Sequence, residues 1–176
     1  MLFAIGDKVV HPRFGAGLVT ALADRELPDG PTHYYVIEVP AQRLTVQVPV
    51  LTAAGAGMRR AMSNLGAARV LAVLGGKPRP LPLNFRERQE QMGSKLRTGR
   101  VTQLIRVVRD LTWHSKHARL TNVDGVYLKQ GIDQLAAEIA LVSGQTISDT
   151  NKQIGAALAT PSGQRPIGVS PSERRE

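Results

Sequence analysis

The amino-acid sequence predicts an α+β fold in which a small antiparallel β module is followed by an all-α helical domain. Residues 7–50 alternate short runs of β-branched and aromatic residues with turn residues, whereas apolar residues beyond this region recur every three or four positions. The charge divides at the same place, with a net charge of −1 over residues 1–55 and +9 over 56–142. We therefore expect the β module at 1–55, a basic helical domain at 56–158 and, because it is rich in Pro, Ser and Gly, a disordered tail at 159–176.

The composition narrows the classes of protein to which the chain can belong. There is no cysteine, which removes disulfides, thiol nucleophiles and cysteine metal sites. No stretch approaches about 18 consecutive apolar residues, and the first residues lack the pattern of a signal peptide, so we expect a cytoplasmic protein with no membrane partner. The basic helical domain favours a polyanion, nucleic acid above all, as the partner. The alternative is a solvated basic face that keeps the protein soluble.

Four runs near the N-terminus have the length and composition of β-strands. They are KVVHP at 8–12, GLVTALA at 17–23, YYVIEVP at 34–40 and LTVQVPV at 44–50. Four or five short strands require a strongly bent sheet or a small barrel, because an open sheet of this size leaves one face uncovered. The last run meets Pro49, which predicts an edge strand because proline cannot donate to a neighbouring strand. An edge strand can add to a partner's sheet through backbone hydrogen bonds.

The helical domain is predicted to begin with two helices joined by a stiff spacer. Asn64 can cap a helix that ends at Leu74, just before two glycines. Asn84 can cap a second helix that reaches at least Leu96. The prolines of the spacer between them are Pro78, Pro80 and Pro82.

Three further helices are predicted from apolar periodicity and a capping motif. Apolar residues line one face of residues 101–111 and one face of residues 128–142. Thr146 with Asp149 resembles a capping box for a last helix to about residue 158. The arginines that lie off the first apolar stripe are Arg100, Arg106 and Arg109.

Phe85 is unusual because a large apolar ring follows the proline spacer and opens a charged helix. The free N–H groups and partial positive charge of a helix N-terminus suit a phosphate. The candidate DNA-contact residues in this region are Asn84, Phe85, Arg86, Arg88, Lys95 and Arg97. A flat apolar side chain at such a position can act as a wedge in the minor groove. The residue pattern equally allows Phe85 to form a hydrophobic staple or to fold back on Met92.

Other chemically active residues form no recognisable catalytic or metal motif. His114 and His117 are three positions apart on a predicted helix, but no carboxylate is evident as a third metal ligand. Trp113 could stack on a base, although its position favours packing between helices. Glu87 and Glu90 fall on one helix face, as solvated surface pairs do. We therefore predict a protein that is not an enzyme and holds no cofactor and no metal.

Four segments occur in a fixed order: FAIGDKVVHPRFGAGLV from Phe3, LTVQVP from Leu44, NF at 84–85 and VVRDL from Val107. Together they resemble the CarD/CdnL family of bacterial RNA polymerase-binding transcription regulators, and the similarity extends from about residue 2 to residue 143. The resemblance implies a Tudor/SH3-like β module that binds the RNA polymerase β subunit. It also implies a helical domain that contacts promoter DNA at the upstream edge of the transcription bubble and alters open-complex stability without catalysis.

The resemblance further assigns residues to the two contacts. Family members commonly carry tryptophan where this chain has Phe85, which implies a wedge with a smaller contact area and no indole N–H. The residues implied in the polymerase contact are Arg25, Leu44, Thr45, Val46 and Gln47. Gln47 occupies a position often held by arginine, which implies a weaker contact at that point.

We accordingly expect a nucleoid-associated monomer that bridges RNA polymerase and promoter DNA. Its DNA sequence preference should be weak, because phosphate and minor-groove contacts carry little base information. A Tudor/SH3-like RNA- or ribosome-associated protein is the alternative, in which the basic helices bind RNA phosphates. A hydrolase or metal enzyme with an unrecognised site is a second alternative. Preferential binding to RNA would favour the RNA-associated protein, and metal bound to the purified protein would favour the enzyme.

Overall fold

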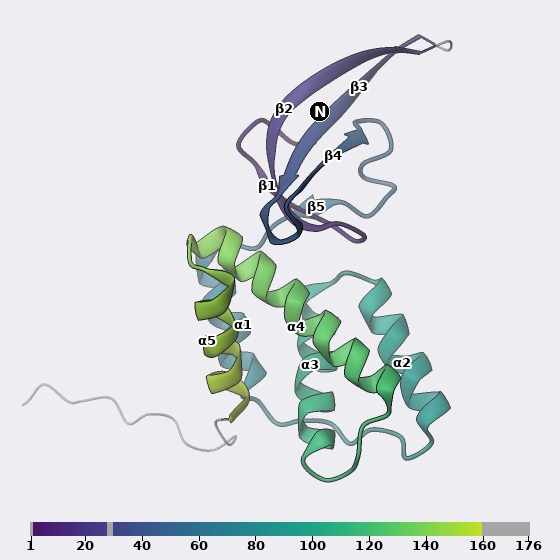
Figure 1. Ribbon diagram of the computed structural model, residues 1–176, viewed down its shortest axis with the longest axis vertical. Helices are drawn as coiled ribbons and strands as arrows, with labels where there is room; N and C mark the ends of the chain where they lie inside the picture. Colours follow the sequence, from purple (N-terminus) through teal and green to yellow (C-terminus); the bar gives the residue numbers. More distant parts are fainter. Residues whose placement is uncertain (1, 28–29, 160–176) are drawn as a thin grey trace, which may run out of the picture.

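The computed structural model describes residues 2–27 and 30–159, which form two modules stacked along the long axis of the molecule (Figure 1). An antiparallel sheet forms the first module and helices form the second, so the α+β arrangement predicted from the sequence is confirmed. Apart from Ala159, the tail predicted at 159–176 lies outside the described residues.

The sheet has five strands in the order β4-β3-β2-β1-β5, and every described pairing is antiparallel. The strands are β1 (Lys8–His11), β2 (Gly15–Leu27), β3 (Gly30–Val39), β4 (Leu44–Pro49) and β5 (Arg59–Arg60), and the 3-10 helix η1 (Pro40–Gln42) joins β3 to β4. The prediction that β4 is an edge strand is confirmed. The sequence did not predict β5, whose pairing with β1 extends the sheet beyond residue 55.

The β module has an apolar core of its own. Its buried members are Phe3, Val9, Val19, Tyr35, Ile37, Val39, Val48, Ala53 and Met58. A register shift between Val19 and Ala21 marks an irregularity in the pairing of β2 with β3, which bends the strand. The two strands also pack closely at Gly17, where an added Cβ would lie 2.6 Å from the carbonyl oxygen of Glu38. Only glycine fits at this point.

The helices of the second module occupy the positions that the sequence pattern predicts. They are α1 (Asn64–Leu74), α2 (Phe85–Arg97), α3 (Val101–Ser115), α4 (Asn122–Ser143) and α5 (Ile147–Ala159). Asn84 caps α2 as predicted, because its side-chain oxygen accepts a hydrogen bond from the Arg86 N–H at 2.9 Å. The cap predicted for α1 was wrong by one residue. The Ser63 hydroxyl accepts from the Gly66 N–H at 3.1 Å, which places Asn64 inside the first turn.

The last helix, α5, begins at the predicted capping pair. The Thr146 hydroxyl accepts from the Asp149 N–H at 3.1 Å and donates to the Asp149 carboxylate at 2.8 Å. Both bonds hold the first turn of α5 against fraying. The helix then packs on α1 and α4 and buries Ile154.

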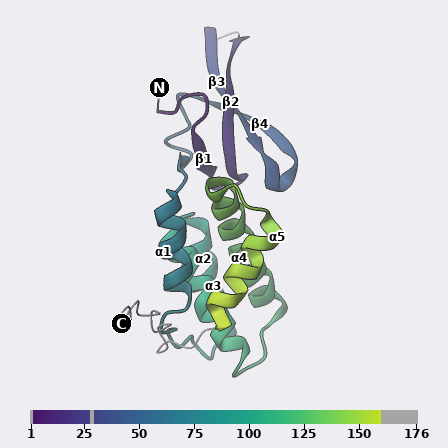
Figure 2. The same cartoon turned by 90° about the vertical axis from the view of Figure 1, so that its left-hand side faces the viewer.

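The central element of the second module is α4. It contacts each of the other helices and also reaches β1 and β2 (Figures 1 and 2). A capping box starts α4, in which the Thr121 hydroxyl accepts from the Asp124 N–H and the Asp124 carboxylate accepts from the Thr121 N–H. Fully buried members of the shared helical core include Met92, Val107, Leu111, Leu135 and Ile139.

A partly buried ion pair joins the two modules. Arg59 of β5 donates two hydrogen bonds to the carboxylate of Glu138 on α4, at 2.7 and 2.8 Å. Glu138 is 1% exposed, and its carboxylate also accepts from the Met62 N–H at 2.9 Å. Arg59 also donates a hydrogen bond to the backbone carbonyl of Gly99. Because a bidentate guanidinium–carboxylate pair has a fixed planar geometry, this contact fixes the sheet relative to α4.

Candidate functional site

The N-terminus of α2 lies at the end of the helical module that faces away from the β module (Figure 1). Phe85 is 48% exposed, and Leu83 just before the helix is 92% exposed. Met92 is fully buried in the helical core, whereas Phe85 does not belong to that core. About half of the Phe85 side chain is therefore open to solvent at the helix start, outside the core that contains Met92.

Charged side chains surround the exposed ring. The guanidinium carbon of Arg86 lies 5.7 Å from the centroid of the Phe85 ring, in a cation–π arrangement. Glu87 and Glu90 are also exposed on the first turns of the helix. The helix start thus presents an apolar ring with a cation directly beside it and carboxylates on adjoining positions.

Arg88 is not a surface cation, contrary to the prediction that it contacts DNA. Its side chain is only 4% exposed, and its guanidinium donates to the Asp124 carboxylate with a shortest distance of 2.8 Å. The same guanidinium donates to the backbone carbonyls of Pro82 and Leu83, at 2.8 and 3.4 Å. Burial removes Arg88 from any DNA contact. It instead ties the segment that precedes Phe85 to the start of α4.

Asp124 makes the burial of Arg88 possible by neutralising its charge. The Asp124 carboxylate also accepts hydrogen bonds from the backbone N–H and the hydroxyl of Thr121, at 3.0 and 2.8 Å. Burial alone would raise the pKa of Asp124, but the hydrogen bonds from Arg88 and Thr121 outweigh it and lower the pKa below the usual 3.8. The carboxylate therefore stays ionised, and the pair anchors the segment from Pro82 to Phe85, which we call the Phe85 tip.

Lys95 and Arg97 lie near the other end of α2. Burial lowers the pKa of the half-buried Lys95 amine, which also has Asp110 and Arg106 as charged neighbours on α3. Arg97 is exposed and lines a pocket against the β module. At 1.5 Å per residue, about 18 Å of helix separates Phe85 from Arg97. The structure therefore does not bring these two cations to the Phe85 tip.

The packing around Lys95 assembles a basic cluster that the sequence did not reveal. The charges of Arg79 and Arg106 both act on the Lys95 amine there. The buried carboxylate of Asp110 accepts from the Arg79 backbone N–H at 3.1 Å and from the Arg109 side chain at 3.0 Å. The arginines off the α3 stripe were visible in the sequence. The proline spacer packs on α3 and thereby places Arg79 near Lys95. No pattern in the sequence predicts this contact.

The side chains of the edge strand β4 alternate in exposure. Thr45 and Gln47 are exposed, whereas Leu44 and Val46 are half-buried against the sheet. Within the described residues β4 pairs only with β3, so its other edge offers backbone groups for pairing. Four of the five residues expected to contact polymerase therefore form one continuous outer edge.

Arg25 lies apart from that edge, on the β2–β3 hairpin. Its guanidinium carbon is 5.7 Å from the centroid of the Tyr34 ring, and its side chain is exposed. Pro49 at the end of β4 pairs with Tyr34, whereas Arg25 pairs with Thr32. Arg25 is thus placed farther along the hairpin than any residue of β4.

His114 lies in the last turn of α3, whereas His117 lies just beyond the end of that helix, and the two histidines have different surroundings. Burial and then the charge of Arg88 lower the pKa of the buried His114. His117 is exposed, and its ring lies 4.2 Å from that of Trp113, centroid to centroid. Across the part of the chain that the structure describes, no three side chains able to bind a metal gather. Trp113 is half-buried and lines a pocket between the ends of α1, α3 and α5, which agrees with packing between helices.

Comparison with known proteins covers both modules. Residues 3–62 match the CarD-like/TRCF RID domain family, and residues 69–155 match the family of the CarD C-terminal domain. A Bacillus subtilis (strain 168) protein described as "Putative transcription factor YdeB" is 27% identical over 147 residues, which are 82% of this chain and 95% of that protein. Among the described helices, none has the length and apolar character needed to cross a membrane. With both of its modules matched in this order, the chain belongs to the CarD-like family of transcription regulators.

Proposed function

We propose that the protein binds the RNA polymerase β subunit through β4 and promoter DNA at the upstream edge of the transcription bubble through its helical domain. By holding both partners it changes the stability of the open complex. The observation that carries this proposal is the exposed ring of Phe85 at a helix start that the buried Arg88–Asp124 pair anchors. Membership of a transcription-regulator family with RNA polymerase interaction supports the choice of partner.

In the proposed DNA contact, Phe85 enters the minor groove where duplex DNA meets melted DNA. Unstacking a base step costs a few kcal/mol, roughly, which apolar contact with the ring offsets. Arg88 already holds the carbonyls of Pro82 and Leu83, so the tip loses little conformational entropy on binding. The exposed side chain of Leu83 adds apolar surface beside the ring.

A phosphate beside the wedge would be held by Arg86, which is adjacent to the ring. The cations around Lys95, which are Arg79 and Arg106, lie away from the ring and would meet phosphates farther along the DNA. These contacts make affinity fall with salt and carry little sequence information. The exposed carboxylates of Glu87 and Glu90 oppose phosphate binding at the first turns, which limits the electrostatic contribution near Phe85.

In the proposed polymerase contact, β4 adds to a sheet of the β subunit. Backbone hydrogen bonds would supply much of the affinity, while Thr45 and Gln47 face outward to the partner. Arg25 would extend the contact along the hairpin. The Arg59–Glu138 pair supports this arrangement because it keeps the edge strand and the Phe85 tip at a constant separation.

Permanganate footprinting of promoter complexes with polymerase tests the proposal. Adding the wild-type protein should increase the reactivity of thymines at the upstream bubble edge. Phe85→Ala should lose that increase, whereas Leu65→Ala, which trims a 63% exposed side chain on α1, should keep it. An unchanged upstream edge with wild-type protein bound to polymerase would contradict the proposed site of action.

A further inference from the structure

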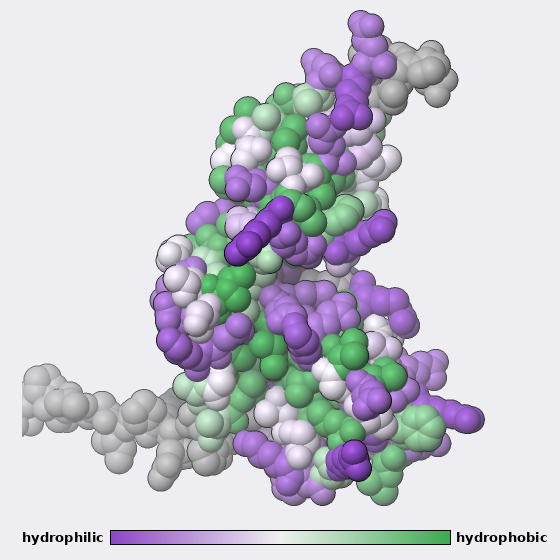
Figure 3. Space-filling model, in the orientation of Figure 1, coloured by the Kyte–Doolittle hydropathy of each residue, from purple (hydrophilic) through white to green (hydrophobic). Residues whose placement is uncertain are grey.

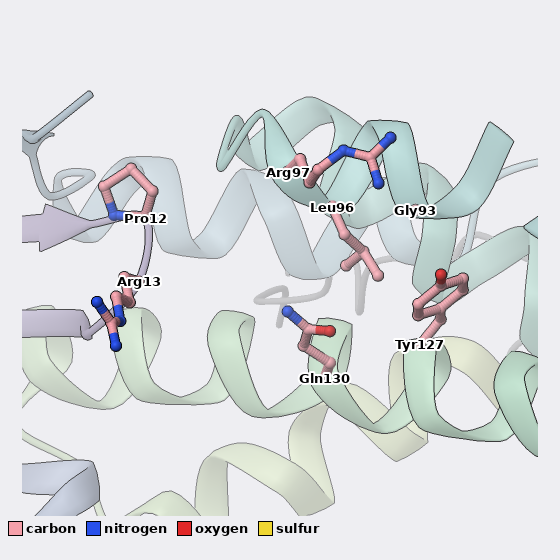
Figure 4. A pocket seen from close by; sticks show the side chains of 7 residues that line it. All are labelled: Pro12, Arg13, Gly93, Leu96, Arg97, Tyr127 and Gln130. Carbon is pink, nitrogen blue, oxygen red and sulfur yellow. The ribbon is translucent and has the colours of Figure 1, made fainter. Parts of the chain in front are cut away.

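A groove separates the β1–β2 turn from the C-terminal part of α2 and from α4; we call it the junction groove. Its volume is about 320 Å³, and its polar lining residues are Arg13, Arg97, Tyr127 and Gln130. Figure 4 shows Arg13 and Arg97 on opposite sides of the opening, with Tyr127 and Gln130 reaching into it from α4. The surface view shows a hollow between the two modules that hydrophilic side chains border (Figure 3). The groove is therefore lined by residues of both modules.

Every polar side chain of the junction groove can donate a hydrogen bond, and none of its lining residues is acidic. Within residues 2–27 and 30–159, neither Arg13 nor Arg97 forms an ion pair with a carboxylate. Lys129 and Asp133, which line the adjoining pocket, pair with each other. The groove thus combines two uncompensated guanidinium groups with neutral donors, which is the chemistry of an anion site.

A glycine brings two of the donors together. A Cβ added at Gly93 would lie 3.0 Å from the Tyr127 hydroxyl oxygen and 3.4 Å from an Nη of Arg97. Both donor groups therefore flank the same point above the backbone of α2, and any side chain at Gly93 would push into them. The absence of a side chain at this position keeps the floor of the groove open.

The opposite side of the groove is held in place by the β1–β2 turn. The Nδ1 atom of His11 accepts from the backbone N–H groups of Arg13 and Phe14, at 3.1 and 3.4 Å. The guanidinium carbon of Arg13 lies 5.5 Å from the centroid of the Phe14 ring. These contacts order the turn, so Arg13 is presented at the groove from a defined backbone.

We infer that the junction groove binds a ligand that carries two or more phosphates, with Arg13 and Arg97 as the cations and Tyr127 and Gln130 as neutral donors. Guanidinium groups bind phosphate oxygens through paired N–H bonds. Two guanidinium groups on opposite sides of one opening suit two phosphates better than a single small anion. The site is separate from the Phe85 tip and requires neither the wedge nor polymerase.

Two kinds of ligand carry phosphates that the junction groove could bind. Successive phosphates of a single nucleic-acid strand would run along the groove, and the Phe14 ring nearby could stack on a base. The polyphosphate chain of a free nucleotide would instead fill the groove alone, which has the volume of a small-molecule site. Inorganic tripolyphosphate and a short single-stranded oligothymidylate serve as probes for these two sources.

Calorimetric titration of the full chain with each probe tests the inference. Arg13→Gln and Arg97→Gln should each weaken binding by about tenfold, the loss of a charge-assisted hydrogen-bonded contact. Tyr127→Phe should weaken it less. Arg69→Gln is the charge-matched control, because Arg69 is exposed on α1, which lies away from α2 (Figure 1). Melting temperatures of the variants establish that each remains folded.

Each outcome has a defined meaning. Stoichiometric binding of tripolyphosphate that is tighter than binding of the oligonucleotide supports the site with a nucleotide as ligand. Binding of the oligonucleotide alone, weakened by both groove variants, supports the site with a nucleic-acid strand as ligand. Absence of binding by both probes, or equal effects of Arg13→Gln and Arg69→Gln, overturns the inference. Phe85→Ala should leave tripolyphosphate binding unchanged, so failure of the wedge and failure of the groove are distinguishable.

Discussion

The guanidinium of Arg88 on α2 and the carboxylate of Asp124 on α4, two residues 36 positions apart in sequence, form a buried pair with a shortest N–O distance of 2.8 Å. Arg88 also holds the two carbonyl groups that precede the Phe85 tip. The pair therefore converts a loop that follows a proline spacer into a rigid support for an exposed ring. Its disruption should affect both stability and the placement of Phe85.

Arg88→Gln should destabilise the protein by about 3–5 kcal/mol, because it leaves the buried Asp124 charge without its partner. Arg86→Gln, which removes an exposed cation two positions earlier, should change the unfolding free energy by less than about 0.5 kcal/mol. Urea unfolding followed by circular dichroism measures both values. Equal stabilities of the two variants would contradict the structural role assigned to Arg88.

Acid should destabilise the protein in a window that begins near neutral pH. Burial and Arg88 lower the pKa of His114, and burial and Arg13 lower that of His11, from the usual 6.5. The unfolded chain therefore takes up protons first. The stability present above pH 6.5 is lost as the pH falls through the folded-state pKa values.

Thermal melts between pH 7.5 and pH 5 measure this loss. His114→Gln should reduce the dependence of the melting temperature on pH, because it removes one of the two groups. His33→Gln, which replaces an exposed histidine of the β module, should retain more of that dependence. If the melting temperature of His114→Gln fell more steeply with acid than that of the wild type, His114 could not be a group whose pKa folding lowers.

Glu138→Gln should loosen the junction between the modules, because the neutral amide loses the charge-assisted bonds to Arg59. The chain has no cysteine, so spin labels can be placed at Thr45→Cys on β4 and Gln91→Cys on α2. The distance distribution between the labels should broaden in Glu138→Gln. It should stay narrow in Asp133→Asn, an exposed position on the same helix. Identical distributions in both variants would show that the ion pair does not set the module arrangement.

Much of this arrangement was open to prediction from the sequence, because it rests on local signals. The Asn84 cap lies next to Phe85, and the edge position of β4 was marked by its own Pro49. Apolar periodicity likewise marks the helices, since each stripe lies within one element. These features need no knowledge of distant partners.

The features that the sequence could not provide depend on contacts between distant residues. Arg88 looks like a surface cation until Asp124 is folded against it, and Glu138 meets Arg59 across 79 positions. The short strand β5 has no period of its own and exists because β1 offers it a partner. The junction groove requires both modules to be in place, so its residues show no common pattern along the chain.

Gln47→Arg should strengthen binding to the polymerase β subunit, because an exposed outward position on β4 gains a cation. We expect an increase of up to about fivefold, the range of one favourable exposed charge contact. Gln145→Arg adds the same charge at an exposed position beyond α4 and should have no effect. Pull-down titrations with the β subunit measure the affinities of the two variants and of the wild type.

The edge itself is tested by Thr45→Pro and Val46→Pro, which remove adjacent backbone donors of β4. Since alternate N–H groups of an edge strand point outward, at least one of the two should abolish polymerase binding while the helical module remains folded. Recovery of the β subunit with both variants would refute β4 as the contact.

The lifetime of the open promoter complex after competitor challenge tests the central claim most directly. With polymerase saturated by each protein, Phe85→Ala should remove the change in lifetime that the wild type produces, and Phe85→Trp should enlarge that change because the indole adds contact area and an N–H donor. Leu65→Ala should behave as the wild type. Equal lifetimes with wild type, Phe85→Ala and Phe85→Trp, while polymerase binding persists, would contradict a wedge at Phe85.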